Sequence, residues 1–352
     1  ARGQTEESAS LVNLEKELRE LLTKGPKRIR VMAPLEEKVI EDCSIHIRGS
    51  ANNLGNTVSR GFLSVISDPK ALNLPSDQSG RKQLADWIAS PDNPLTARVF
   101  VNRCWHWLFG HGLVRTVDNF GTTGEKPSHP ELLDELTLSF IDSGWSVKKL
   151  IREIVLSRTY RLSPLPTNDL RVQRDPENRW FGRANRKRLD AECIRDAMLH
   201  SSQTIDLKSG GPSFSNDLKA DYSYKDWSNR RSIYQPVFRN SMHPFLSHFD
   251  IADPSSPTGE RNASVVVQQS LYLMNDPFVL SQAELTAKHL IQIASQNEER
   301  IQAVFMTVLG RSPHQTELRL VRKSLQSNDT ELTNWTRIVQ ALYAHADFRY
   351  LD

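Results

Sequence analysis

Three histidines lie within a stretch of the sequence that is rich in aromatic and glycine residues: His106, His111 and His129. Together with Asp118 they offer imidazole and carboxylate ligands of the kind that suits zinc, iron or nickel. Their spacing does not favour a metal, because two ligands on one helix are usually three or four residues apart and no HExxH motif occurs. The sequence favours a packed corner between helices, and leaves the three histidines as weak candidates for metal ligands.

A second group of reactive side chains lies in "RRSIYQPVFRNSMHPFLSHFDIADP", residues 230–254. Arginine, tyrosine, histidine and aspartate together could form a polar pocket for a sugar or a carboxylate. A Ser-His-Asp hydrolase would need a nucleophile elbow such as GxSxG, and none occurs. Polar side chains in an irregular segment more often fix the loop itself. If a site exists, we expect it where this segment faces residues 103–129. The candidate catalytic residues are Asp118, Arg231, Tyr234, His243, His248 and Asp250.

The most basic part of the chain lies between residues 179 and 195, where aromatic side chains alternate with arginines. Such a surface could bind an anionic polysaccharide through stacking and charge-assisted hydrogen bonds. The alternative is that these arginines pair with the acidic side chains beside them. The candidate ligand-binding residues are Trp180, Arg183, Arg186 and Arg188.

The composition excludes several classes of protein. The 352 residues carry a net charge of only +3, which does not favour nucleic acid as a partner. No apolar stretch approaches the ~20 residues that span a bilayer. The three cysteines form no CxxC or CxxCH motif, so we expect no cofactor in this chain, and haem c only on an absent domain or a partner. Because the chain begins "ARGQTEESAS", we expect it to be a processed or excised fragment.

Hydrophobic periodicity predicts a mainly α fold, a helical bundle with an extended N-terminal arm and an irregular insertion containing a few short strands. The best strand candidate is residues 230–240. The expected regions are an N-terminal helix and arm (1–78), a central helical bundle (79–202), an irregular insertion (203–262) and a C-terminal helical region (263–352).

Capping signals predict where several helices begin. Asn93 precedes Pro94 at the expected start of one helix, and Ser128 forms a capping box with Glu131 at another. Further along, Ser312 and Pro313 are expected to begin a third helix after a stop at Gly310. A leucine stripe predicts a further helix over residues 11–24.

Several separated motifs, in order, resemble one known family. They include "RKQLADWIASPDNPLTARVFVNRCWHWLFGHG", "RRSIYQPVFRNSMHPFLSHFDIADPSSPTGERNAS", "VFMTVLGRSPHQTEL" and the ending "ALYAHADFRYLD". The chain is similar to the planctomycete PSD domain, a C-terminal domain of unknown function in secreted proteins that often carry cytochrome-c-like N-terminal domains. The resemblance covers nearly the whole chain, most securely 80–352. It implies a secreted, periplasmic or cell-envelope location, with other domains of a longer parent protein or envelope partners beside it.

Two functions are therefore expected. The first is a secreted or envelope-associated binding or scaffolding module, in a redox-linked or polysaccharide-handling assembly. The second is a hydrolytic or metal-assisted enzyme with a His/Asp/Arg site. An enzyme should gather these polar groups in a pocket with perturbed pKa values, whereas a scaffold should bury them in satisfied hydrogen bonds.

Overall fold

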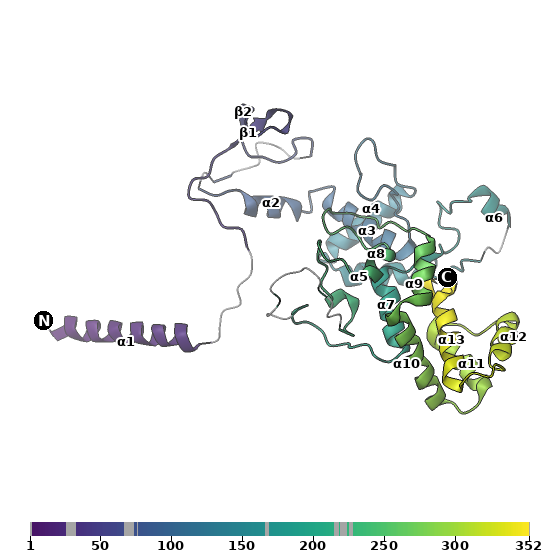
Figure 1. Ribbon diagram of the computed structural model, residues 1–352. Coiled ribbons are helices and arrows are strands. Elements are labelled where there is room, and N and C mark those ends of the chain that lie inside the picture. Colours follow the sequence, from purple (N-terminus) through teal and green to yellow (C-terminus); the bar gives the residue numbers. More distant parts are fainter. Residues whose placement is uncertain are drawn as a thin grey trace. The chain divides into compact units, whose positions relative to one another are not determined.

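The computed structural model describes residues 2–25, 33–66, 74–75, 77–165, 169–214, 218, 224 and 228–351, drawn in Figure 1. The chain forms two compact units, Ala1–Ser90 and Pro91–Asp352. The fold is mainly α, as the periodicity predicts. No helix among the described residues is long and apolar enough to cross a membrane.

The first unit contains little packed structure among its described residues. Its elements are helix α1 (Arg2–Lys24), strand β1 (Cys43–His46), 3-10 helix η1 (Ile47–Gly49), strand β2 (Leu54–Val58) and helix α2 (Arg81–Ile88). The two strands pair in antiparallel register, with an irregularity between Ser44 and His46. The leucine stripe of α1 is helical as predicted, and its leucines between residues 11 and 22 are exposed.

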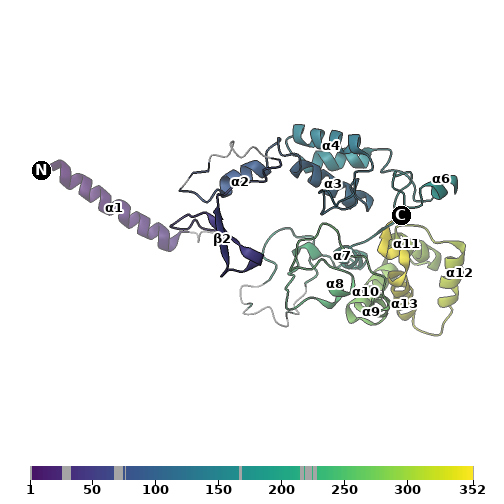
Figure 2. The same cartoon turned by 90° about the horizontal axis from the view of Figure 1, so that it is seen from above.

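In the second unit, a first hydrophobic core joins helices α3 (Thr96–Phe109), α4 (Pro130–Asp142) and α5 (Val147–Leu156). Helix α3 contributes a buried stripe in which every fourth residue faces the core, from Ala97 to Phe109. Gly110 ends this helix with φ 85°, a left-handed conformation that glycine adopts without strain. Figure 2 shows α3 and α4 side by side, and their residues are in contact.

A second core in the same unit is larger and forms around helix α10. Its helices are α7 (Ala191–Ser201), α8 (Pro244–His248), α9 (Val267–Asn275), α10 (Pro277–Ile293), α11 (Asn297–Leu309), α12 (Gln315–Ser324), α13 (Glu331–Ala344) and α14 (Ala346–Arg349). Helices α10 and α13 pack along each other, and Trp335 and Tyr343 of α13 are fully buried. Tyr343 Oη lies 2.5 Å from Ser201 Oγ, so the core also holds a paired polar group.

Short elements connect the two cores. Helix α6 (Asp169–Arg174) lies in the segment between α5 and α7, and strand β3 (Lys187–Arg188) pairs antiparallel with strand β4 (Tyr350–Leu351) at the end of the chain. The sequence did not indicate this pairing, because two-residue strands carry no periodic signal.

The strand predicted over residues 230–240 is wrong. Within the described part of 203–262 the structure has 3-10 helix η3 (Ser232–Tyr234) and isolated bridges, and no strand. The backbone here bonds to an isolated bridge partner, to its own turn and to side chains, and not to a continuous neighbouring strand. The backbone N–H and the hydroxyl of Ser232 both donate to Asp196 Oδ1, at 2.8 and 2.6 Å.

Several predicted helix starts are displaced by one or two residues. The predicted cap at Asn93 is wrong, because α3 begins at Thr96 with Leu95 as N-cap. Asn93 still accepts from the backbone N–H groups of Leu95 and Thr96 just before the helix. Helix α4 begins at Pro130 with His129 as N-cap, so the predicted capping box of Ser128 is wrong. Ser128 Oγ instead shares a hydrogen bond with the ring of His129.

The start of α12 is also displaced. The sequence predicts Ser312 as its cap, whereas the structure has His314 in that position. The backbone N–H of His314 donates to Glu317 at 2.6 Å, which satisfies one free amide at this helix end. The stop at Gly310 is confirmed, with φ 68°.

Candidate functional site

A cleft of about 200 Å³ lies in the second unit where the end of α3 meets β3 and the loop before α9. Three stretches of chain line it. The end of helix α3 and the two residues after it supply His106, Trp107, Gly110 and His111. Residues 185–190 form a second wall, and Phe249, Asp250 and residues 260–263 form the third. These stretches are up to about 150 residues apart in sequence, as their numbers show.

Helix geometry explains which residues of α3 reach this cleft. Trp105 and Phe109 continue the buried stripe and stack on each other in the first core. The next positions around the helix, His106 and Trp107, therefore face the cleft. His106 is only 7% exposed, whereas Trp107 is 38% exposed. The cleft thus has a buried imidazole inside and an accessible indole beside it.

The second wall is attached to the end of α3 by two side chains. Asn185 donates from Nδ2 to the carbonyl of Phe109 at 2.9 Å, and the ammonium of Lys187 donates to the carbonyl of Trp107. The last carbonyls of a helix have no partner within the helix, and cations are favourable there. Leu189, just beyond β3, donates its N–H to the carbonyl of Arg349 at 2.7 Å. The C-terminal strand therefore helps to hold this wall.

A buried ion pair joins the second wall of the cleft to the third. Arg188 donates from Nη1 to Asp250 Oδ2 at 2.7 Å and to the carbonyl of Ser264 at 2.5 Å. The side chains of Arg188 and Asp250 are only 8% and 17% exposed. Burial raises the pKa of Asp250, but hydrogen bonds from Ser264 and Arg188 outweigh it and lower that pKa overall. Asp250 also adopts φ 63°, a left-handed conformation that the surrounding bonds hold in place.

Two further contacts hold the loop that carries Glu260. The backbone N–H of Gly259 donates to Asp118 Oδ2 at 2.7 Å, and the other oxygen of Asp118 accepts from Arg103. A Cβ at position 259 would lie 2.2 Å from the Asp118 carboxylate, so a larger residue there would push this carboxylate away from the Gly259 amide. Arg261 makes a two-pronged ion pair with Glu192 of α7, at 2.6 and 3.0 Å.

Replacing Asp118 by alanine is expected to loosen this loop without unfolding the unit. The Gly259 amide should exchange with solvent about tenfold faster, since a hydrogen bond to a charged group contributes about 1.5 kcal/mol. Hydrogen exchange followed by mass spectrometry measures this. Arg103→Ala is the control, because it removes the ion pair and keeps the bond to Gly259. Equal exchange in Asp118→Ala and the parent chain would show that the loop is held by other contacts.

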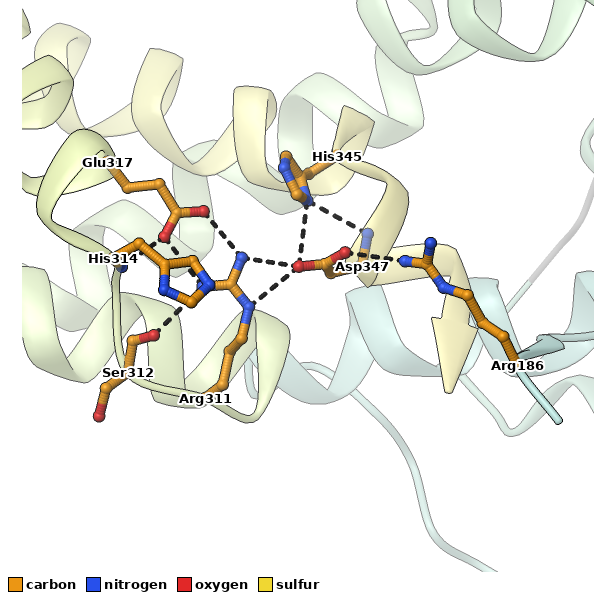
Figure 3. Close-up of polar contacts among 7 residues, drawn as sticks. All are labelled: Arg186, Arg311, Ser312, His314, Glu317, His345 and Asp347. Carbon is orange, nitrogen blue, oxygen red and sulfur yellow. Dashed lines mark hydrogen bonds and ion pairs between the residues drawn. The ribbon is translucent and has the colours of Figure 1, made fainter. Parts of the chain in front are cut away.

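The edge of the cleft continues into a network of charges at the C-terminus, drawn in Figure 3. Asp347 accepts from Arg186 at 3.0 Å on one oxygen and from Arg311 at 2.9 and 2.6 Å on the other. Arg311 also donates to both oxygens of Glu317, at 2.9 and 2.7 Å. Figure 3 shows Arg186 reaching Asp347 from the side opposite Arg311. The Arg186 guanidinium also lies over the Tyr350 ring, 5.0 Å from its centroid.

Two buried polar atoms in the cleft have no hydrogen-bond partner among the described residues: Nδ1 of His106 and Nη2 of Arg188. Such orphaned groups are costly and rare, so each calls for a physical explanation. Burial also lowers the pKa of both His106 and His111. Both imidazoles are therefore neutral at pH 7, and each offers one donor and one acceptor.

The structure places the sequence candidates in different surroundings. His106, His111, Arg186, Arg188 and Asp250 line the cleft. Asp118 lies outside the lining and anchors its loop. The remaining candidates lie elsewhere: His129, Trp180, Arg183, Arg231, Tyr234, His243 and His248.

Several of these remaining side chains serve local structure. His243 accepts from the Phe245 N–H at the start of α8, and burial lowers its pKa to about 4. His248 packs edge-on against Tyr272. Arg183 donates to the carbonyls of Asp175 and Pro176. Their functional roles stay predictions, but no residue in this group shares the cleft.

Sequence reasoning missed several residues of the cleft lining, among them Glu260, Arg261 and Asn262, and assigned the aromatic residues of the packed corner, Trp107 included, to packing. Glu260 was missed because it follows a loop rich in proline and serine, which reads as a connection. The available signal was "TGERN", in which a glycine immediately precedes a charged pair. Trp107 differs from Trp105 only in its angle around α3, and the extent of its exposure depends on what packs beside the helix.

The described residues contain no group of three or more His, Cys, Asp or Glu side chains placed to hold a metal ion. His106 and His111 come near each other, but His129 bonds Ser128 at the start of α4. The cysteines Cys43, Cys104 and Cys193 are free thiols.

Comparisons with known proteins place the chain in a family. No curated protein and no solved structure gives a significant match. A family model described as "PSD1: Protein of unknown function (DUF1553)" matches residues 80–325, which is more than half of the chain. The match includes the whole cleft lining, the first core and most of the second core. The matched region agrees with the resemblance inferred from the sequence motifs, and the chain therefore belongs to the PSD1 family of proteins of unknown function.

Proposed function

We propose that this chain is a carbohydrate-binding module of an envelope-associated assembly, and that the cleft at the end of α3 is its binding site. One observation carries the proposal: His106 and Arg188 line a cleft beside the exposed ring of Trp107, and each has a buried nitrogen without a hydrogen-bond partner among the described residues. Binding sites typically combine an aromatic or apolar surface with a few placed polar groups. A ligand with hydroxyl groups would supply the missing hydrogen-bond partners.

The rigidity of the walls supports this proposal. Hydrogen bonds from Asn185, Lys187 and Arg188 join the three stretches of chain that line the cleft. A site held in one geometry loses less conformational entropy when a ligand binds. The polar groups are therefore positioned before the ligand arrives.

Replacing Trp107 by alanine tests the proposal. The full chain should bind members of a broad glycan array that carries neutral, amino and acidic sugars. The variant should lose at least about tenfold in affinity, because an aromatic surface contributes about 1.4 kcal/mol or more when covered. Trp180→Ala is the matched control, because Trp180 is 64% exposed and lies outside the cleft lining. Equal binding by the parent chain and Trp107→Ala, or no glycan bound at all, would refute the assignment.

The sequence resemblance supports the rest of the proposal. It implies that the module works outside the cytoplasm, in the periplasm or cell envelope, beside other domains or partners. Any haem c of a redox-linked assembly would then lie on such a domain or partner. Fractionation of the producing cells, with an antibody against this chain, is expected to find it outside the cytoplasm.

Hydrolysis is a second candidate function, favoured by Glu260. The charge of its carboxylate acts on both His106 and His111, whose imidazoles burial keeps neutral. A neutral imidazole near a carboxylate is suited to move protons in acid–base catalysis. If the chain is a hydrolase, bound glycans should be cleaved, and Glu260→Gln should stop cleavage while it preserves binding.

A further inference from the structure

The charges of the cleft indicate which class of sugar it takes, an inference that rests on the proposed function. Its arginines are already paired. Arg188 binds Asp250 at 2.7 Å, Arg261 binds Glu192 at 2.6 Å, and Arg186 binds Asp347 at 3.0 Å. An acidic ligand would have to compete with these carboxylates or to displace one of them. Breaking the buried pair of Arg188 with Asp250 is costly, and an anion would also have to displace the carboxylates of the two more exposed pairs, so the paired arginines disfavour an anion.

The cleft also contains charged side chains of both signs that form no ion pair among the described residues. Glu260 accepts no hydrogen bond on its carboxylate from the residues that the structure describes, and it forms no ion pair with them. Lys187, on the neighbouring wall, donates to a backbone carbonyl of α3. Asp190 also lines the cleft, and its side chain has no hydrogen bond or ion pair among the described residues. Two carboxylates and one ammonium leave no net positive charge to attract an anion.

The remaining polar atoms match a hydroxyl group. A neutral imidazole can accept a hydrogen bond at one nitrogen and donate at the other, and a hydroxyl can do both. Arg188 Nη2 is a free donor, and the Glu260 carboxylate is a free acceptor. The residues of the cleft therefore offer both donors and acceptors, which is what a sugar hydroxyl needs.

The volume of the cleft limits how much of a polysaccharide it can hold, and Trp107 provides an aromatic surface beside it. A cleft of about 200 Å³ is smaller than the ~300–1,000 Å³ of sites for drug-sized ligands. It suits one sugar unit rather than several. Trp107 lies beside it with an exposed ring, against which the apolar face of a sugar can pack.

We propose that the cleft binds one uncharged sugar unit of a polysaccharide, packed against Trp107 and hydrogen-bonded by His106, Arg188 and Glu260. Specificity then comes from hydroxyl positions and not from ion pairing. A site built to bond hydroxyls rejects analogues that lack them, because its own buried polar groups are left unpaired.

Calorimetry on the glycans that the array identifies tests the charge class. Neutral oligosaccharides should bind with an affinity that changes less than about twofold between 20 and 300 mM NaCl, because no ion pair forms. Glu260→Gln keeps the shape and part of the hydrogen bonding, and should weaken binding about tenfold, the effect of one bond to a charged group. Glu177→Gln is the control, because Glu177 is also exposed and lies outside the cleft lining.

Each outcome separates this inference from the proposed function. If uronate oligosaccharides bind in preference, with affinity that falls steeply as salt rises, the cleft takes acidic sugars and the inference is wrong, while the binding function stands. If neutral sugars bind and Glu260→Gln has no effect, the hydroxyl-bonding geometry is wrong. If no sugar of any class binds the full chain, the proposed function itself fails.

Discussion

Replacing Asp250 by alanine should lower the free energy of unfolding of the second unit by about 3–5 kcal/mol. The substitution leaves the Arg188 guanidinium, 8% exposed, without its carboxylate partner. It also removes the acceptor of the Ser264 N–H and hydroxyl, at 2.9 and 2.8 Å. Urea unfolding followed by circular dichroism measures the change. Because Asp250 lines the cleft, sugar binding should be lost in the same variant.

Two further variants show whether the buried charge is the cause. Asp253→Ala removes an exposed carboxylate of the same loop, which accepts from the Ser255 N–H at 2.8 Å, and should cost less than about 1 kcal/mol. Arg188→Met in the Asp250→Ala background removes the orphaned charge, and should restore part of the lost stability. A loss below about 1 kcal/mol in Asp250→Ala would mean that the pair does not hold the loop.

Replacing Glu317 by glutamine should destabilise the second unit at neutral pH and much less in acid. Hydrogen bonds from Arg311, with smaller contributions from the His314 N–H, lower the pKa of Glu317 from 4.5 to about 2. A shift of this size corresponds to about 3 kcal/mol. Solvent screening of a network near the surface reduces the expected effect to about 1–2 kcal/mol.

The sign of the pH dependence follows from the lowered pKa. The folded state holds the charged carboxylate, so its stabilisation is complete above pH 4.5 and is lost as the pH falls through about 2. The difference between Glu317→Gln and the parent chain should therefore be largest at pH 7 and small at pH 2. Urea unfolding at several pH values measures it. Glu298→Gln, at the exposed ion pair with Arg322, is the control and should change little. A difference that is independent of pH would contradict the role given to the Glu317 charge.

The helices of this chain could be predicted because their signals are local. The apolar stripe of α3, the glycine stops at Gly110 and Gly310, and the Ser146 cap of α5 depend on residues within one or two turns. Helix starts were less predictable, since several side chains compete for the same free amides. At α4 and α12, His129 and His314 take the N-cap position that a nearby serine was expected to fill.

The predicted strand at 230–240 failed for a long-range reason. Alternating apolar residues there suggest a strand, but Asp196 of α7 binds the backbone of Ser232, and the buried Arg195 donates to the carbonyl of Arg230. These partners lie more than thirty residues away in the sequence, as their numbers show. Tertiary contacts override a weak local preference.

By itself, the sequence determined the mainly α class, the positions of most helices and the resemblance to the PSD1 family, because periodicity and motifs are properties of neighbouring residues. Only the tertiary structure decided which polar residues share a site. His106, Arg188 and Glu260 come from three distant stretches, and their neighbours His129, Arg183 and Asp253 lie outside the cleft lining. The tertiary structure also decided which charged side chains form ion pairs. A carboxylate from a distant segment can neutralise an arginine that appears free in the sequence. Charge and burial depend on packing, which local sequence patterns do not encode.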